Sequence, residues 1–480
     1  MRFGIKTLLG VVLGYMPLFT FAQTAEVRSL GFFEGQEECV EIAELTNGGY
    51  VLAGTTNANN LWNTDVFVYT LNPDLSISWV TMLGDYGLNS ANGVAVLQDG
   101  IAVLTTILSY DNAYQLRLYK LNFDGELIFT RDLGSSDWDF GKRVRAGNDG
   151  SIFLLAESYA NQESGIQCLV YKLDEEGNIV WEKSLGDASN DIPADLAVDA
   201  GNNLFVLGTR MINEEGGQFQ CWKFNADGSE AWYFNPGLTG SYFARAMCLY
   251  NNGVVATGHE ITNQGNDKII LGVDDSGMLL WDRHYPLEGN QSLGGIAYTG
   301  DGFALAGESD TFGAGGWGVY VMKSDPNGWW NGAAVFGGAE DEKAYSLIVD
   351  SNSRILFAGE TDSYGDGTRN AYLVRLPTNN VLAEYILSLE VLEQDSFTDI
   401  SEKLTPPAQK FFLASQVPII FHLYPELSQG TLLFNSQGRR VAEISDLESL
   451  EWHLQSLCSG MYFLTPISSD KTNPFRVFKP

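Results

Sequence analysis

Carboxylates and large aromatic side chains recur together in polar, glycine-rich segments of this chain. Carboxylates bind hydroxyl groups and work in pairs as general acid and base, while aromatic faces stack on sugars or anchor protein partners. We therefore expect a ligand-binding face that takes a glycan or a protein. Its candidate residues are Glu34, Trp62, Asp85, Trp138, Asp139, Asp187, Trp317 and Glu342.

Catalysis is the alternative function. Asp139 and Glu342 could meet in a central funnel as the carboxylate pair of an extracellular hydrolase or lyase. That mechanism requires a few acids deep in the funnel with raised pKa values. The chain has no G-x-S-x-G, H-E-x-x-H or GxxxxGK[ST] motif. We therefore assign no catalytic residue and expect a binding protein rather than an enzyme.

Two glycine- and aspartate-rich segments raise the question of Ca²⁺, which prefers oxygen ligands. They are SDTFGAGG (309–316) and TDSYGDGTRN (361–370). Neither has the D-x-[DN]-x-[DN]-G spacing of a specific calcium loop. We assign no metal ligand and no cofactor, and Ca²⁺ stays open.

Charge and composition exclude several classes of protein. The 480 residues include 28 basic and 60 acidic side chains, a net charge of −32, which argues against nucleic-acid binding and against an anionic membrane surface. Apolar residues are 45%, enough for a folded core. The five cysteines are scattered without a C-x-x-C pair, so we expect buried free thiols.

The elements that must position these side chains come from a repeat. Leu-Gly recurs at 30–31, 83–84, 133–134 and 185–186, and related pairs stand at 236–237, 287–288 and 336–337. The interval is about 51 residues, and each unit reads as four short strands with turns. Seven such units predict an all-β, seven-bladed β-propeller over 23–385.

The hairpin of the third and fourth strands is the part of the unit whose sequence varies least between units, as in KLDEEGNIVW (172–181). Glycine supplies the positive φ of a tight turn. The aromatic residue that follows is expected to be a structural wedge between sheets. These wedges are Trp79, Phe129, Trp181, Trp232 and Trp281. The Asp, Gly and Trp of this hairpin resemble the pyrroloquinoline-quinone-like propellers, a resemblance of architecture that implies no quinone.

Closure of the ring has two candidate strands. EVRSLG (26–31) matches the fourth strand WEKSLG (181–186), so the mature N-terminus is expected to supply the outer strand of the last blade. The rival is 381–385, which directly follows the last third strand. We favour the N-terminal strand, because either choice removes an unpaired edge but only the first repeats the sequence.

The first 22 residues are typical of a secretory signal peptide. Arg2 and Lys6 precede an apolar stretch from Leu8 to Phe21, and Thr20-Phe21-Ala22 fits the site that a signal peptidase cleaves. No other stretch is long and apolar enough to span a bilayer. We therefore expect a secreted or cell-surface protein without a transmembrane span, and a monomer.

The C-terminal segment contains an ordered set of motifs. A strand ends in Gly438-Arg439, a later strand follows L-x-x-G-x-Y-x-L with Gly460 and Tyr462, and Lys479 is near the end. This pattern resembles the type A sorting domain of the type IX secretion system of Bacteroidota. Tyr424-Pro425 is followed by Glu426, where the family usually has a Tyr-Pro-Asn-Pro-like stretch. The resemblance implies a small β-sandwich over 418–480. It also implies export by that secretion machinery. Residues 386–417, where the repeat stops and the chain contains acidic residues and Pro406-Pro407, are expected to be a linker.

Overall fold

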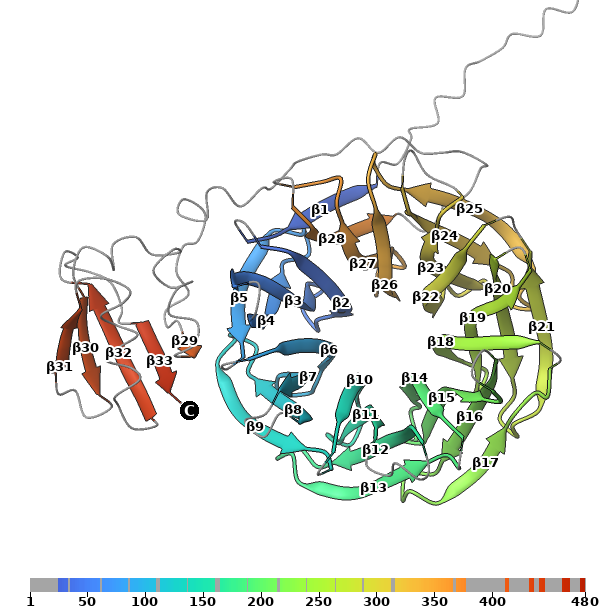
Figure 1. Cartoon of the computed structure of the whole chain (residues 1–480), viewed down its shortest axis with the longest axis horizontal. Coiled ribbons are helices and arrows are strands. Elements are labelled where there is room, and N and C mark those ends of the chain that lie inside the picture. Colours follow the sequence, from blue (N-terminus) through green and yellow to red (C-terminus); the bar gives the residue numbers. More distant parts are fainter. Residues whose placement is uncertain are drawn as a thin grey trace, which may run out of the picture.

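The computed structural model describes residues 25–376 with short gaps, and five strands beyond them. The gaps are 33–34, 61–62, 85–86, 109–112, 136, 160–164, 188, 214–215, 239, 264, 287–288, 312–315 and 366–367. Within the described residues the strands form seven four-stranded sheets and one five-stranded sheet. The seven sheets stand around a common axis as the blades of a propeller (Figure 1), which confirms the predicted fold.

Each blade is an antiparallel meander whose first strand is innermost (Figure 1). Blades 1 and 2 are β2 (Glu37–Glu44), β3 (Tyr50–Asn60), β4 (Asn63–Leu71), β5 (Ile77–Leu83), and β6 (Asn89–Val96), β7 (Ile101–Leu108), β8 (Tyr114–Leu121), β9 (Leu127–Leu133). Blades 3 and 4 are β10 (Asp139–Ala146), β11 (Ile152–Ser158), β12 (Gln167–Leu173), β13 (Ile179–Leu185), and β14 (Asp191–Val198), β15 (Leu204–Met211), β16 (Gly217–Phe224), β17 (Glu230–Phe234).

The remaining blades repeat this order until the ring closes. Blades 5 and 6 are β18 (Ser241–Tyr250), β19 (Gly253–Thr262), β20 (Gly265–Val273), β21 (Leu279–Tyr285), and β22 (Gln291–Tyr298), β23 (Phe303–Ser309), β24 (Gly318–Ser324), β25 (Trp330–Phe336). Blade 7 is β26 (Glu342–Val349), β27 (Ile355–Thr361), β28 (Asn370–Leu376) and β1 (Glu26–Leu30).

The seventh blade joins the two ends of the propeller. β1 pairs antiparallel with β28, with Val27 opposite Val374. This confirms that the N-terminal segment supplies the outer strand of the last blade. The rival segment 381–385 lies outside the described residues.

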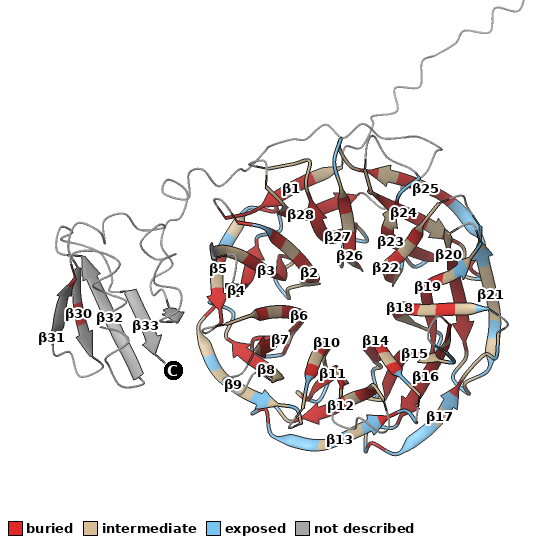
Figure 2. Cartoon of the chain, viewed as in Figure 1, coloured by how far each residue is buried: buried red, intermediate tan, exposed pale blue. Residues whose placement is uncertain are grey.

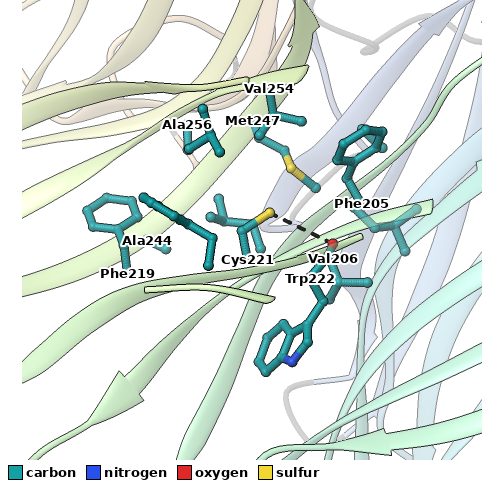
Figure 3. Packing of buried hydrophobic residues seen from close by; sticks show 14 of the residues in the cluster. Phe205, Val206, Phe219, Cys221, Trp222, Ala244, Met247, Val254 and Ala256 are labelled. Atoms are coloured by element: carbon teal, nitrogen blue, oxygen red, sulfur yellow. Dashed lines mark hydrogen bonds between the residues drawn. The ribbon is translucent and has the colours of Figure 1, made fainter. Parts of the chain in front are cut away.

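The core lies between neighbouring sheets. Figure 2 shows the middle strands of the blades mostly buried and the outermost strands partly exposed, as in β13. Figure 3 shows the packing between blades 4 and 5, where Cys221 and Phe219 of β16 lie in one cluster with Met247 and Ala244 of β18. The four cysteines that the structure describes are free, and three of them are buried, as expected.

The predicted aromatic wedges pack against the hairpin of the next blade. A Cβ at Gly177 would lie 2.8 Å from the ring of Phe129, and one at Gly125 would lie 2.9 Å from Trp79. Both glycines have positive φ, 81° and 82°. Glycine is therefore required at this turn for its conformation and for the space that the ring occupies.

All seven innermost strands contain a β-bulge at the same position. The pairing with the second strand shifts by one residue, as between Gly141 and Arg143 in β10. A bulge leaves one extra residue unpaired and re-aims its side chain. The bulge residues are Val40, Asn92, Lys142, Ala194, Arg245, Gly294 and Tyr345.

Beyond the propeller, five short strands form one sheet in the order β29-β33-β32-β30-β31. They are β29 (Phe411–Leu413), β30 (Thr431–Asn435), β31 (Arg440–Ile444), β32 (Gly460–Pro466) and β33 (Phe475–Lys479). These strands are consistent with an all-β module, and the predicted sandwich and domain boundaries stay predictions.

Candidate functional site

The predicted acids Asp139 and Glu342 occupy the first position of their inner strands, three residues before the bulge. Both are fully buried, with 0% of the residue exposed. Asp139 accepts a hydrogen bond from Ser135 Oγ (2.9 Å), and Glu342 accepts one from the Gly338 amide (2.7 Å). Both carboxylates therefore hold the loop that leads into their own blade.

The same position is buried in every blade, which makes it a structural ring. Its members are Glu37, Asn89, Asp139, Asp191, Tyr242, Gln291 and Glu342. The recurring glycine packs against this ring, because a Cβ at Gly134 would lie 2.6 Å from Asp139 Oδ2. Strands β10 and β26 lie on opposite sides of the propeller (Figure 1). The fold therefore keeps Asp139 and Glu342 apart rather than pairing them.

The other predicted ligand-face residues have different surroundings. Asp187 is half exposed and forms an ion pair with Arg210. Trp317 is partly buried, and its amide donates to Asp341 Oδ1 (2.8 Å). Trp138 is 50% exposed. Glu34, Trp62 and Asp85 lie outside the described residues.

The predicted sorting motif falls partly on described strands. Gly460 and Tyr462 belong to β32, and Lys479 ends β33. Gly438 and Arg439 lie outside the described residues, as do 1–22 and 386–410.

A concave pocket of about 380 Å³ opens between blades 2 and 3. Three aromatic rings form one wall: Tyr114 begins β8, Phe140 is the second residue of β10, and Tyr159 follows β11. Their ring centroids are 4.8 Å apart for Tyr114–Phe140 and 5.9 Å for Phe140–Tyr159. Trp138 meets Tyr114 edge to face at 5.7 Å. The predicted residue Trp138 thus extends this aromatic wall.

Polar groups line the rest of the pocket. The bulge residues Asn92 and Lys142 both contribute, together with Ser90, Thr106 and Glu157. Lys142 Nζ lies 2.8 Å from Glu157 Oε2. Sequence reasoning missed Asn92 and Lys142, because a bulge is visible only in the pairing of two strands.

Hydrogen bonds fix the orientation of these polar groups. Thr106 Oγ donates to Asn92 Oδ1 (2.7 Å) and accepts the amide of Gly141 (2.9 Å). Tyr159 Oη donates to Glu157 Oε1 (2.8 Å). Burial, together with Glu157, raises the pKa of Tyr159 to about 12, so the phenol stays protonated. The pocket therefore offers amide, hydroxyl, ammonium and carboxylate groups beside an aromatic wall.

A second group of carboxylates belongs to the neighbouring blades 6, 7 and 1, where Glu308, Glu360 and Glu38 lie on β23, β27 and β2. Burial raises the pKa of Glu38, and the nearby Glu360 adds to the shift while Arg369 and Lys343 oppose it. Burial also raises the pKa of Glu308. These two glutamates, which the sequence did not single out as a pair, have the raised pKa values that the catalytic alternative requires.

The two calcium segments are only partly described. Asp310 accepts a hydrogen bond from the Asn290 side chain (2.7 Å), and Asp362 pairs with Arg369 (3.0 Å). Among the described residues, no group of three or more His, Cys, Asp or Glu side chains is placed to hold a metal ion. The same part of the chain contains no helix long and apolar enough to cross a membrane.

No known protein family and no curated protein sequence matches this chain. Solved structures of similar fold include a protein of unknown function from Dyadobacter fermentans, 11% identical, with a TM-score of 0.44 over 74% of this chain and 98% of that one. The periplasmic gluconolactonase of Pseudomonas aeruginosa is 13% identical, with a TM-score of 0.45 over 63% and 87%. A puromycin hydrolase is 13% identical, with a TM-score of 0.49 over 72% and 52%. These likenesses concern the propeller fold alone.

Proposed function

We propose that this chain is an extracellular binding propeller that recognises a glycan through the pocket between blades 2 and 3. The observation that carries the proposal is the aromatic wall of Tyr114, Phe140 and Tyr159 around a cavity of about 380 Å³. Ligand sites combine such apolar walls with a few fixed polar groups. Asn92, Lys142 and Glu157 supply the polar groups here.

A glycan fits this arrangement better than a protein ligand. The apolar face of a sugar ring stacks on an aromatic side chain, while its hydroxyls need donors and acceptors at the rim. A protein partner would require a larger contact area, about 800 Å² on each side. The pocket is concave and of the size of one or two sugar rings. Binding of a protein is therefore the alternative outcome of the binding test.

Thermal melts of the mature propeller with soluble polysaccharides and peptides test the proposal. A ligand that binds the native state raises the melting temperature. The Trp138→Ala variant should lose most of that rise, because Trp138 extends the wall. The matched control is Tyr233→Ala, which removes another exposed aromatic residue, on β17 of blade 4. Equal loss in both variants, or a shift with peptides alone, would contradict a glycan pocket at this position.

Hydrolysis is the second candidate function, favoured by the raised pKa values of Glu38 and Glu308. A carboxyl whose pKa is raised keeps its proton to a higher pH and is therefore better suited to act as a general acid. The same melts should then yield shortened sugars, and Glu38→Gln or Glu308→Gln should abolish them without any loss of binding. Ligand recovered unchanged after long incubation would exclude this activity for that ligand.

The destination of the protein is part of the proposal. The signal peptide over 1–22 and the sorting-domain resemblance over 418–480 support secretion, or attachment to the cell surface, through the type IX machinery. Mass spectrometry of the exported protein should find a new N-terminus at Gln23. A chain lacking 418–480 should stay in the periplasm; its efficient appearance outside the cell would contradict this route.

A further inference from the structure

The innermost strands carry few basic residues, and nearly all of those that the structure describes are neutralised. Lys142 lies 2.8 Å from Glu157, and Lys343 lies 3.2 Å from Glu360. Arg145 reaches Glu41 of blade 1 at 2.5 Å and Asp195 of blade 4 at 3.1 Å, and Asp195 also lies 3.4 Å from Arg143. A chain with a net charge of −32 has many acids available for such pairs.

Arg245 is the exception among the basic residues of the described inner strands. It is the bulge residue of β18, between Ala244 and Ala246. Its side chain is exposed, and the structure gives it neither an ion pair nor a hydrogen bond with the described residues. The carboxylate of Glu308 is close enough to act electrostatically on Arg245, although the two side chains form no ion pair. Arg245 therefore presents the donors of an exposed, unpaired guanidinium from the innermost strand of blade 5.

A second polar group without a partner lies beside Arg245. His259 on β19 is opposite Phe243, two residues before Arg245 on the neighbouring strand. Only 6% of His259 is exposed, and its Nδ1 has no hydrogen-bond partner in the described structure. Its ring stacks on Phe243 with centroids 5.3 Å apart and an interplanar angle of 12°. Buried polar atoms normally have a partner, so His259 is a polar side chain whose hydrogen bonding the surrounding protein leaves incomplete.

We propose that Arg245 and His259 form an anion subsite that binds one carboxylate of the ligand, so that the glycan recognised by this propeller is an acidic one built with uronic-acid units. The inference rests on the proposed function and names its ligand class. A guanidinium binds a carboxylate through two parallel hydrogen bonds, and a neutral imidazole can donate one more. Phe243, stacked on His259, supplies an apolar surface for the sugar ring.

The position of Arg245 relates this subsite to the pocket. Asn92 and Lys142 line the pocket from bulge positions of β6 and β10, and Arg245 occupies the same position in β18. Equivalent positions of a propeller lie at the same depth around its axis. A chain of several sugar units can therefore contact the aromatic wall with one ring and Arg245 with the carboxylate of another.

Glu308 limits the negative charge of the ligand group that can bind at this subsite. It is the residue of β23 equivalent to His259, and its pKa is raised by burial. The charge of Glu308 repels a doubly charged phosphate more strongly than a singly charged carboxylate. The local charges therefore favour a monoanion.

The experiment measures the affinity of the mature chain for a galacturonic acid trimer and for the methyl ester of the same trimer. The acid form should bind at least about tenfold more tightly, because a charge-assisted hydrogen bond is lost on esterification. Arg245→Gln should remove this preference. Glu308→Gln should strengthen the binding of the acid form, because it removes a negative neighbour at nearly constant shape. A thermal melt of each variant without ligand reports its folding.

The outcomes separate the subsite from the pocket. Equal affinity for acid and ester, or an unchanged preference in Arg245→Gln, would overturn the anion subsite and leave the glycan pocket standing. Loss of acid binding in Arg245→Gln, combined with no effect of Trp138→Ala, would keep the subsite and contradict the pocket. Tighter binding of inorganic phosphate than of the trimer would overturn the choice of a carboxylate.

Discussion

Thr106 Oγ accepts the amide hydrogen of Gly141 at 2.9 Å, across the boundary between blades 2 and 3. Thr55 and Thr209 do the same for Ala91 (3.0 Å) and Ala244 (2.8 Å) of the blades that follow them. Each of these amides precedes the bulge of its inner strand. The second strand of one blade thus stabilises the bulge of the next, and with it the positions of the bulge side chains.

Removing the hydroxyl of Thr106 should destabilise the propeller and disturb the pocket. Thr106→Val leaves the buried Gly141 amide without an acceptor, which costs about 1–3 kcal/mol. Thr106→Ser keeps the acceptor and should cost clearly less. Denaturant unfolding of both variants measures the difference, and similar losses would show that packing of the Thr106 methyl group, not the hydrogen bond, is what matters.

The glycine of each outer hairpin should be limited by the neighbouring aromatic ring as well as by its φ. Gly177→Ala would place a Cβ 2.8 Å from Phe129 at a φ of 81°. Gly300 has a φ of 91°, and a Cβ at that residue would meet no atom within 4 Å, so Gly300→Ala is the matched control for backbone strain. The control should lose about 1 kcal/mol. Gly177→Ala should lose at least twice as much in denaturant unfolding; equal losses would contradict a tight ring contact.

His259 should make the protein sensitive to acid. Burial, reinforced by Arg245, lowers the pKa of His259 to about 4 from an ordinary 6.5. The unfolded chain therefore binds a proton that the folded chain rejects, so stability is lost as pH falls from about 6.5 to about 4. The loss amounts to about 3 kcal/mol.

Thermal melts at pH 7 and pH 4 measure this effect of His259. His259→Phe should lose less stability than the wild type between these two pH values. His284→Gln is the control, because His284 is more exposed and is paired with Glu260 (2.7 Å). An identical acid loss in the wild type and in His259→Phe would contradict the depressed pKa.

Closure by β1 can be tested with a disulfide. Val27 and Val374 are opposite residues of β1 and β28. Replacing both with cysteine should yield a bridge that closes a very long loop and stabilises the fold by about 2–4 kcal/mol. The melting temperature should rise in the oxidised protein and return on reduction. Failure of the pair to oxidise would contradict this register.

The fold was predictable because its repeating contacts leave a repeating sequence. Leu30-Gly31 begins a series whose glycines pack against the first residue of an inner strand, and Trp79 begins a series whose rings pack against hairpin glycines. Where the aromatic wedge is absent, the hairpin glycine that it would contact is absent too. Glu26 takes the wedge position in blade 7, pairing with Arg375, and the next hairpin has Leu75 at a φ of 65° where the others have glycine.

The site was less predictable, because its side chains follow no repeat. Asp139 and Glu342 each follow a repeat glycine at the same spacing in the sequence. This regular spacing indicates a structural role, which the residue types alone do not reveal. Asn92, Lys142 and Arg245 share a position only through the bulge, which depends on hydrogen bonding between strands. Trp138 was found from the sequence because it is a large aromatic residue beside a turn, and the structure places it against Tyr114.

The most direct test of the central claim is an isothermal titration of the best oligosaccharide ligand against the wild type and Phe140→Ala. Phe140 lies in the middle of the aromatic wall, between Tyr114 and Tyr159. Truncating a central aromatic anchor costs about 2 kcal/mol or more, which corresponds to a loss of affinity of about thirtyfold. We predict such a loss in Phe140→Ala and unchanged binding in Tyr233→Ala. Unchanged affinity in a folded Phe140→Ala protein would contradict a glycan site between blades 2 and 3.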